Sequence, residues 1–441
     1  MASQAEQLAS NLNFSAFAKA DDLKKRILFT LGALIVYRIG TYIPIPGIDP
    51  SAVADLFQRQ QSGILGMFNM FSGGAVGRMA IFALNIIPYI SASIIMQLLA
   101  ATVPSLEEIK KTGSQGQKTI NQYTRYLTVV LATVQGYAIA VGLQSTNAVI
   151  DPGVFFQVTT VISLVGGTMF LMWLGEQITS RGIGNGISLI IFAGIIAQLP
   201  LALAFMFEQG RQGAISTPVL LGFVIMTVVV IGFIVFFERA QRRLIVQYPK
   251  RQQGNKIYQG DSSHLPLKLN SAGVIPAIFA SSLIFLPATA ADISSTGGPE
   301  WLAAVSAALG PGSPGFIILF AFLIIFFAFF YTALVFNPMD TADNLKKSGG
   351  FIPGIRPGER TAQHIDYVLT RITVMGALFL ALVCVSPELI RGTIPIAFGG
   401  TSILIVVSVT MDTVGQIQGH MLAHQYDGLI KKSRLRGKKR K

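Results

Sequence analysis

Residues that could do chemistry are scarce in the long apolar stretches of this chain. Ion-coupled transporters usually carry Asp, Glu, Lys or His deep in their spans, where these groups bind or relay the coupling ion. Here Arg38 lies near one end of an apolar stretch, and Glu176 and Asp412 lie at the ends of two others. We expect Arg38 to snorkel toward the membrane surface. This pattern leaves a small-molecule symporter without an evident coupling group.

The sequence also lacks motifs for metal, nucleotide or nucleophilic chemistry. It contains no Walker A motif, no His/Glu zinc pattern and no nucleophile elbow. His420 and His424 have an i, i+4 spacing but no plausible third ligand, so solvated side chains are the better interpretation. Cys384 is the single cysteine, which excludes an intrachain disulfide and a cysteine metal cluster. We therefore expect no enzyme activity, no metal and no cofactor.

Two apolar stretches, far apart in the chain, carry the same polar inset. The first reads IPYISAS from Ile87 to Ser93, and the second reads IPAIFASS from Ile275 to Ser282. Proline frees a carbonyl and hydroxyls need partners, so such positions usually face other helices or a water-filled cavity. The insets indicate two related halves that meet at one pathway. Chance is the alternative, because these residue types are common in membrane helices.

The composition is that of a polytopic membrane protein. Of 441 residues, 51% are hydrophobic and only 12% are charged, whereas about a quarter are charged in a soluble domain. A hydrocarbon core about 30 Å thick needs about 20 apolar residues per helix. The sequence therefore predicts an all-α fold with ten transmembrane helices, at 27–43, 79–103, 121–143, 154–174, 187–207, 215–237, 272–291, 315–336, 367–386 and 394–412.

The basic residues gather on one predicted face. All but five of the 34 Lys and Arg residues lie in the two termini, or in and beside the loops 104–120, 175–186, 238–271 and 337–366. The exceptions are Arg38, Arg59, Arg78, Arg211 and Arg391. The positive-inside rule places the basic face, with both termini, in the cytoplasm. The polar N-terminus lacks the pattern of a removable signal peptide.

Ten spans divide into two halves of five, and an odd number per half means that a duplicated unit is inverted. The two insets lie in the second and seventh spans, so each is second in its half. Similar Gly- and Ser-containing starts, 184–188 and 399–403, open the fifth and tenth spans. We predict two inverted five-helix halves around a central pore. The predicted domains are a segment 1–26, halves 27–207 and 208–414, and a basic tail 415–441.

A shorter apolar piece, 63–71, lies between the first two spans and is followed by Ser72, Gly73 and Gly74. It is too short to cross a membrane. One interpretation is an interfacial segment. The other is a re-entrant half-helix, which on its glycine hinge could fold into the outer mouth of a pore and swing away.

Two basic loops contain ordered turn signals. The loop 238–271 has two strand-like runs, 243–248 and 256–258, which predict a hairpin that projects Lys250 and Arg251. The loop 337–366 contains two tight turns, Pro353 to Gly358, around Arg356. Topology alone accounts for basic loops. Ordered turns around single basic residues go further, and indicate docking of an acidic or RNA partner. The tail could bind anionic lipid or ribosomal RNA equally well.

Six stretches together carry a family resemblance: 38–40 with 43–48, 67–74, 88–95, 175–179 with 181–188, 341–349 and 353–358. On these residues the chain resembles the SecY family, whose members form the central subunit of the bacterial protein-translocation channel. The stretches are long, are rarely found elsewhere and extend along essentially the whole chain. One departure is Asn85, where the family pattern leads us to expect glycine. An amide there would weaken the closed seal or contact the neighbouring plug.

The resemblance implies a clamshell hinged between the fifth and sixth spans, with a pore constricted by an aliphatic ring. The ring would consist of Ile86, Ile90, Ile187, Ile191, Ile278 and Ile405. The plug would lie within 63–75 and include Ile64, Leu65, Met67, Phe68, Asn69, Met70, Phe71, Ser72, Gly73 and Gly74. Spans 2 and 3 against 7 and 8 would form a lateral gate that includes Ser91, Gln97, Ser281 and Ser282.

The resemblance also implies the partners. These are SecE and SecG subunits, the SecA motor ATPase, the ribosome (its RNA and the proteins near the exit tunnel), signal sequences and nascent chains, and membrane lipids. The docking residues would be Lys250, Arg251, Lys256, Lys346, Lys347 and Arg356.

The implied function is a protein-conducting channel of the bacterial cytoplasmic membrane, driven by SecA or the translating ribosome. It would pass unfolded secretory polypeptides and release membrane helices laterally. A narrow ring of isoleucines can seal around varied side chains, and when closed it blocks ions by dewetting. The alternatives are an inverted-repeat secondary transporter, which the missing deep carboxylates disfavour, and a membrane scaffold for an acidic partner.

Overall fold

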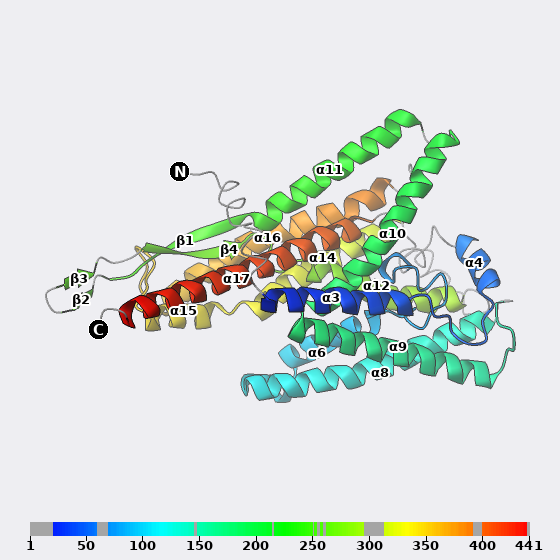
Figure 1. Ribbon diagram of the computed structural model, residues 1–441, viewed down its shortest axis with the longest axis horizontal. Coiled ribbons are helices and arrows are strands. Elements are labelled where there is room, and N and C mark those ends of the chain that lie inside the picture. The colour runs from blue at the N-terminus through cyan, green and yellow to red at the C-terminus, as the bar shows by residue number, and fades with distance from the viewer. Residues whose placement is uncertain are drawn as a thin grey trace. The chain divides into compact units, whose positions relative to one another are not determined.

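The computed structural model is mainly helical (Figure 1). It describes residues 21–59, 69–144, 148–213, 216–249, 251–253, 256–258, 262–294, 313–390 and 399–438. A helix occurs at each of the ten predicted spans: α3 (Asp21–Gly40), α6 (Ile87–Thr102), α8 (Ser114–Gln144), α9 (Val154–Arg181), α10 (Gly186–Arg211), α11 (Thr217–Arg239), α12 (Ile275–Ser294), α14 (Pro314–Val335), α16 (Glu359–Ile390) and α17 (Gly400–Lys438). Shorter helices are α4 (Pro50–Arg59), α7 (Pro104–Lys111) and α15 (Pro338–Lys347). The all-α membrane fold is confirmed.

The spanning potential of these helices is not uniform. Seven described helices are long and apolar enough to cross a membrane, or eight if α6 and α7, which meet at a bend of 96°, form one broken span. Helices α3 and α12, at the first and seventh predicted spans, fall outside this set. The chain is therefore a multi-pass membrane protein, and the count of ten spans stays a prediction.

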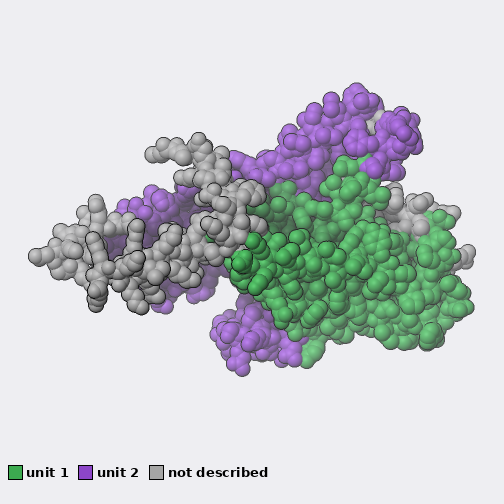
Figure 2. Space-filling model, in the orientation of Figure 1, with its two compact units in different colours: residues 1–92, 124–203, 405–441 green, residues 93–123, 204–404 purple. Residues whose placement is uncertain are grey.

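Two compact units divide the chain (Figure 2). One comprises 1–92, 124–203 and 405–441, and the other comprises 93–123 and 204–404. Each unit therefore combines segments that are distant in sequence. The predicted division into halves 27–207 and 208–414 stays a prediction.

The first unit is held together by α3, α9 and α17. The amide of Ile183, just after α9, donates to Oγ1 of Thr30 in α3 at 3.1 Å. Leu23, Ile183 and Met421 form a buried apolar cluster. Helices α8 and α9 run alongside each other in Figure 1, and they are joined by a bidentate ion pair between Arg125 and Glu176, with N–O distances of 3.1 and 2.7 Å.

In the second unit aromatic side chains join the helices. Phe237 of α11 stacks on Phe379 of α16 with ring centroids 4.4 Å apart. Phe279 of α12 meets Phe327 of α14 edge-on at 5.7 Å. Ring pairs in these geometries add about 0.5–1.5 kcal/mol beyond their buried area.

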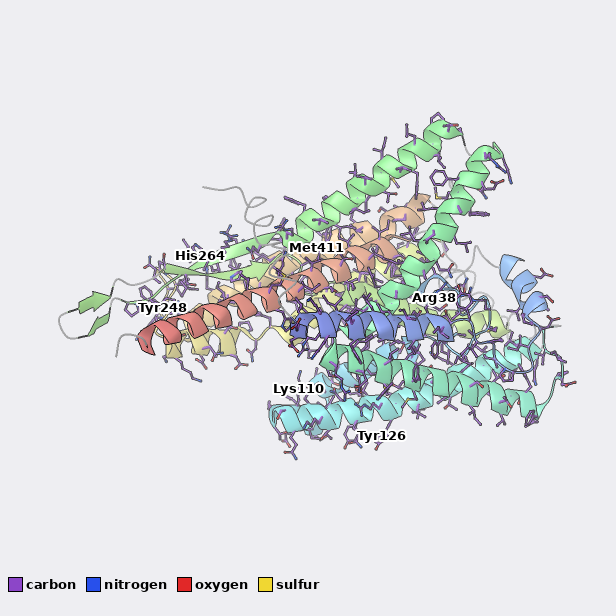
Figure 3. All side chains as sticks on the ribbon, viewed as in Figure 1. Arg38, Lys110, Tyr126, Tyr248, His264 and Met411 are labelled. Atoms are coloured by element: carbon purple, nitrogen blue, oxygen red, sulfur yellow. The ribbon has the colours of Figure 1, made fainter. Side chains whose placement is uncertain are left out.

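A hairpin follows α11 as predicted, but the predicted run 243–248 pairs with 262–268, a strand that was not predicted, and 256–258 pairs with 251–253. Strands β1 (Gln241–Gln247) and β4 (Ser262–Lys268) pair antiparallel, with Gln241 opposite Lys268. Strands β2 (Arg251–Gln253) and β3 (Lys256–Tyr258) extend the same hairpin. Figure 3 labels Tyr248 and His264 along it.

The two proline insets are helix starts rather than helix interiors. Helix α6 begins at Ile87 and α12 begins at Ile275, so Pro88 and Pro276 are each the second residue of a helix. The first N–H groups of a helix have no intrahelical acceptor, so proline loses no bond there, and its fixed φ suits the first turn. The predicted span 79–103 therefore begins too early, because its first residues form turns up to Ile86.

Candidate functional site

The described part of the predicted plug is mostly non-helical. Residues 69–71 form one helical turn, and 72–79 and 81–86 form consecutive turns. The half-helix was predicted over 63–71 with Ser72, Gly73 and Gly74 as its hinge, and its described residues 69–71 are helical and followed by turns, so the assignment stays a prediction. Ile64, Leu65, Met67 and Phe68 lie outside the described residues. Most of the segment 71–86 is buried, so its backbone polar groups must find partners within the protein.

Two arginines hold this segment at the carbonyl of Gly73. Nη1 of Arg38 donates to this oxygen at 2.6 Å, and Nη2 of Arg78 donates to it at 3.1 Å. Both guanidinium groups also lie over the ring of Tyr42, at 4.8 and 4.1 Å. The buried hydroxyl of Tyr37 donates to the adjacent carbonyl of Ser72 at 3.2 Å. The side chain of Arg38 bonds this segment from the end of α3, and the expectation that it snorkels stays a prediction.

Side chains within the segment satisfy further amides. Oδ1 of Asn69 accepts from the N–H of Gly77 at 2.6 Å. Oγ of Ser72 accepts from the N–H of Val76 at 3.2 Å. Ser72 and Asn69 therefore replace the main-chain bonds that a helix would have provided. This internal bonding lets a short, irregular piece of chain remain ordered while buried.

A glycine in α10 makes room for the segment. A Cβ on Gly194 would lie 2.5 Å from the carbonyl oxygen of Phe71 and 3.0 Å from the Tyr37 hydroxyl. One turn further along α10, Nε2 of Gln198 would clash with a Cβ on Gly74. Gly73 and Gly74 also adopt left-handed φ values of 66° and 86°, which glycine adopts without strain. We call Tyr37, Arg38, Arg78, Asn85, Gly194 and Gln198 the plug seat.

Asn85 is the residue that departed from the family pattern. Its φ is +50°, a left-handed conformation that glycine and asparagine tolerate better than other residues. It is 1% exposed. Its Nδ2 donates to the carbonyl oxygen of Phe71 at 2.8 Å. The expected effect on the plug therefore takes the form of a direct contact.

Three predicted ring members lie beside this seat in sequence. Ile86 follows Asn85 and is fully buried. Ile187 and Ile191 precede Gly194 by seven and three residues in α10, a spacing that places all three on one helical face. Ile90, Ile191 and Ile405 are 6%, 5% and 1% exposed, whereas Ile187 and Ile278 are half-buried. The ring assignment stays a prediction.

The predicted gate residues differ in their bonding. The hydroxyls of Ser281 and Ser282 donate to the carbonyls one turn back, at Ala277 and Ile278, with distances of 2.8 and 2.9 Å. Oγ of Ser91 is buried without a partner among the described residues. Gln97 bonds Ser93 through Nε2 at 3.1 Å, while its Oε1 has no partner in the described part of the chain.

The second unit carries the predicted docking residues on one packed body. Gln247, which ends β1, exchanges two backbone hydrogen bonds of 2.9 Å with Phe351. Ile352 and Ile355 pack into an apolar cluster with Leu244 and Leu267 of the hairpin. We call β1–β4, α15 and the turn 351–358 the loop platform.

Arg356 is exposed on the loop platform. The turn around it is anchored by the two isoleucines of the apolar cluster, and Gly354 and Gly358 take φ values of 80° and 105°. Lys346 and Lys347 are also exposed, at the end of α15. The side chains of Lys250, Arg251 and Lys256 lie outside the described residues.

The sequence did not point to most of the plug seat. Arg38 and Arg78 stood out only as two of five basic residues away from the basic face. The residue types of Gly194 and Gln198 gave no signal, because a small or polar residue in an apolar run fits many helix contacts. Their spacing of three and seven residues from Ile191 was the only available clue.

The fold and the plug seat define a multi-pass α-helical membrane protein with an irregular segment lodged among its helices. The family model for SecY matches residues 80–414. Protein translocase subunit SecY of Escherichia coli strain K12 is 57% identical over 430 residues, covering 96% of this chain and 97% of that protein. The subunit of the same name in Vibrio cholerae is 54% identical over 431 residues, with 96% and 97% covered. The chain belongs to the SecY family.

Solved structures share the fold. One described as a protein conducting channel has a TM-score of 0.66 at 18% identity, covering 90% of this chain and 92% of that chain. Sec61 in the canine ribosome-channel complex has a TM-score of 0.63, with the same identity and coverage. At this identity the likeness establishes the fold alone.

Substituting Gly194 by Ala is expected to loosen the plug seat. The new Cβ would press on the Phe71 carbonyl oxygen at 2.5 Å, a backbone atom that cannot rotate away. Overpacking of about 1–3 kcal/mol corresponds to roughly a 5- to 140-fold rise in hydrogen exchange of the amides at 73–77. Gly166→Ala in α9 is the control, because nothing lies within 4 Å of its added Cβ. Equal exchange rates in both variants would contradict the role of Gly194 in making room for the segment.

Proposed function

We propose that this chain is the pore subunit of a protein-conducting channel in the bacterial cytoplasmic membrane, with both termini in the cytoplasm. It passes unfolded secretory polypeptides and releases membrane helices laterally. The observation that carries the proposal is the plug seat. An irregular buried segment inside a membrane protein is tolerated only where protein or a cavity surrounds it. A related structure is described as showing that the plug domain of SecY stabilises the closed state and maintains a membrane seal.

The proposed pore uses the seat and the ring together. The isoleucines Ile86, Ile90, Ile187, Ile191, Ile278 and Ile405 form a constriction that seals by excluding water. Residues 69–74 cover it in the resting state. A translocated chain presents every type of side chain, so an apolar, non-specific ring suits it better than specific polar contacts.

Lateral release needs a seam between helices. We assign it to the regions of Ser91 and Gln97 in α6, and of Ser281 and Ser282 in α12. In support, Ser91 and Gln97 each keep one buried polar atom without a partner among the described residues. Such atoms make a closed contact less stable than an apolar one, which favours a contact that must part.

The driving partners dock on the loop platform. We propose that SecA and the ribosome bind the exposed basic residues Arg356, Lys346 and Lys347, together with Lys250, Arg251 and Lys256. In support, the platform is a packed body and its central turn fixes Arg356 in an exposed position. Sec61 and Ssh1 channels with similar folds were solved on ribosomes. SecE, SecG, signal sequences and lipids complete the proposed set of partners.

Reconstitution tests the proposal directly. The chain is placed in vesicles with SecE, SecG, SecA, ATP and an unfolded secretory precursor. We expect the precursor to become resistant to external protease in an ATP-dependent way. A secondary transporter or a scaffold would leave the precursor fully digested. That result would overturn the proposal if the same mixture transports the precursor when another SecY protein replaces this chain.

Polar substitution of the ring is expected to raise resting ion conductance several-fold. Asparagine in place of Ile90, Ile187, Ile278 or Ile405 would hydrate the constriction and remove the dewetting barrier. Planar bilayers measure the conductance of each variant. Ile196→Asn is the control, because this residue lies on the same helix as Ile187 and is 40% exposed. Unchanged conductance in all four variants would count against the ring.

Arg356→Glu is expected to abolish SecA-driven transport while leaving membrane assembly intact. The substitution reverses the charge at an exposed turn, so it removes attraction to an acidic surface without disturbing the apolar cluster beneath. Protease protection of the precursor measures transport, and co-purification of SecE measures assembly. Arg211→Glu makes the same charge change outside the platform. Normal transport by Arg356→Glu would remove this residue from the docking site.

A further inference from the structure

The buried side chain of Asn85 links a predicted ring residue, its sequence neighbour Ile86, to a predicted plug residue, Phe71. It immediately precedes Ile86 and contacts Phe71, the last residue of the helical turn 69–71. The carbonyl at the end of a helix has no intrahelical donor. The Asn85 amide supplies one, at a distance of 2.8 Å.

Only one of the two polar atoms of the Asn85 side-chain amide has a hydrogen-bond partner among the described residues. Nδ2 is bonded, whereas Oδ1 is buried without a partner among the described residues. A buried unpaired acceptor is unfavourable, and it becomes hydrated as soon as the surrounding contact opens. The two atoms of one side chain therefore act in opposite directions on the closed state.

We propose that Asn85 is a gating residue that latches the plug by its Nδ2 donor while its unpartnered Oδ1 keeps the latch weak. This inference rests on the proposed channel function and deepens it, because it assigns a determinant of the resting state to a residue that contacts the predicted plug. Glycine permits the same left-handed backbone but offers no donor to Phe71.

The backbone explains why a latch can exist here at all. At a φ of +50° most side chains are strained, and asparagine is the common exception because its short amide bonds locally. Asparagine is thus a residue that meets the conformational requirement and still reaches the plug. Asn85→Gly removes the latch without changing the backbone requirement.

The expected size of the effect follows from the bond. Removing the side chain takes one donor from the Phe71 carbonyl and also deletes the unpartnered Oδ1, so these two solvation effects oppose each other. The net change in the free energy of plug release is that of one hydrogen bond. It corresponds to roughly a two- to tenfold change in the resting population of the released plug.

The test measures plug release and channel activity separately. A cysteine at the half-buried position 70 (Met70→Cys) reports release through its rate of modification by a maleimide in the SecE- and SecG-containing complex. The native Cys384 is 1% exposed and gives little background. Planar bilayers report resting conductance, and precursor protection in vesicles reports transport.

Asn85→Gly is expected to raise both the labelling rate and the resting conductance two- to tenfold, with transport retained. Thr160→Val is the matched control, because it removes another buried polar atom of the same unit that has no partner among the described residues, and it should change neither. An unchanged labelling rate in Asn85→Gly, or an equal rise in Thr160→Val, would overturn the latch. Failure of the unsubstituted complex to transport would instead overturn the proposed function, and the labelling comparison would still decide the latch.

Asn85→Asp tests whether the Asn85 side chain acts by donating a hydrogen bond or only by filling space. An ionised carboxylate cannot donate to the Phe71 carbonyl, whereas a protonated one can. Labelling of this variant, relative to Asn85→Gly at the same pH, is expected to slow as the pH is lowered from about 8 to about 5. A constant ratio across this range would contradict a donor role.

Discussion

The structure depends on keeping an irregular, buried backbone segment satisfied inside a membrane protein. Lipid offers no hydrogen-bond partners, so helices normally satisfy their own backbone. Residues 72–86 form turns instead, and neighbouring side chains meet several of the polar groups that the turn hydrogen bonds leave over. Two guanidinium groups converge on the Gly73 carbonyl, and Tyr37 and Asn85 donate to the two carbonyls that precede it, at Ser72 and Phe71.

This kind of attachment suits a part that has to move. The carbonyls of residues 71–73 are held by discrete polar contacts, and a hydrogen bond to a charged group contributes about 1.5–3 kcal/mol. Water in an opened pore can replace such contacts bond for bond, which it cannot do for packed apolar surfaces. Glycine in α10 removes the side chain that would otherwise interlock with the segment. The plug seat is therefore specific enough to define a resting state. Its polar contacts can also be replaced by water when the segment leaves.

The loop platform is held mainly by apolar packing rather than by polar contacts. Its turn sits on an apolar cluster with Ile365, which is fully buried, and is tied to the hairpin by backbone bonds. Apolar packing of this type does not exchange readily with water. A rigid platform can transmit the motion of a docked partner to the helices that continue from it, α11 and α16.

Sequence patterns predicted the helices, the hairpin and the turn around Arg356, because these depend on local propensity and hydrophobic period. They placed the start of α6 eight residues too early, because the apolar run 79–86 is buried as turns and hydropathy does not separate turns from helix. They also missed the packing of Gly194 against Phe71 and the hydrogen bond from Arg38 to the Gly73 carbonyl. Those roles arise from contacts between distant segments, and no local spacing encodes them. The left-handed φ of Asn85 gives the expected glycine at that position a physical reason.

The most direct test compares hydrogen exchange of the segment 69–86 in the resting channel and in a channel that holds a stalled precursor. The amides of Val76 and Gly77, which bond Ser72 and Asn69 side chains at rest, are the reporters. We expect strong protection at rest and fast exchange with the precursor in place. Equal protection in the two states would mean that the segment does not leave the seat during transport.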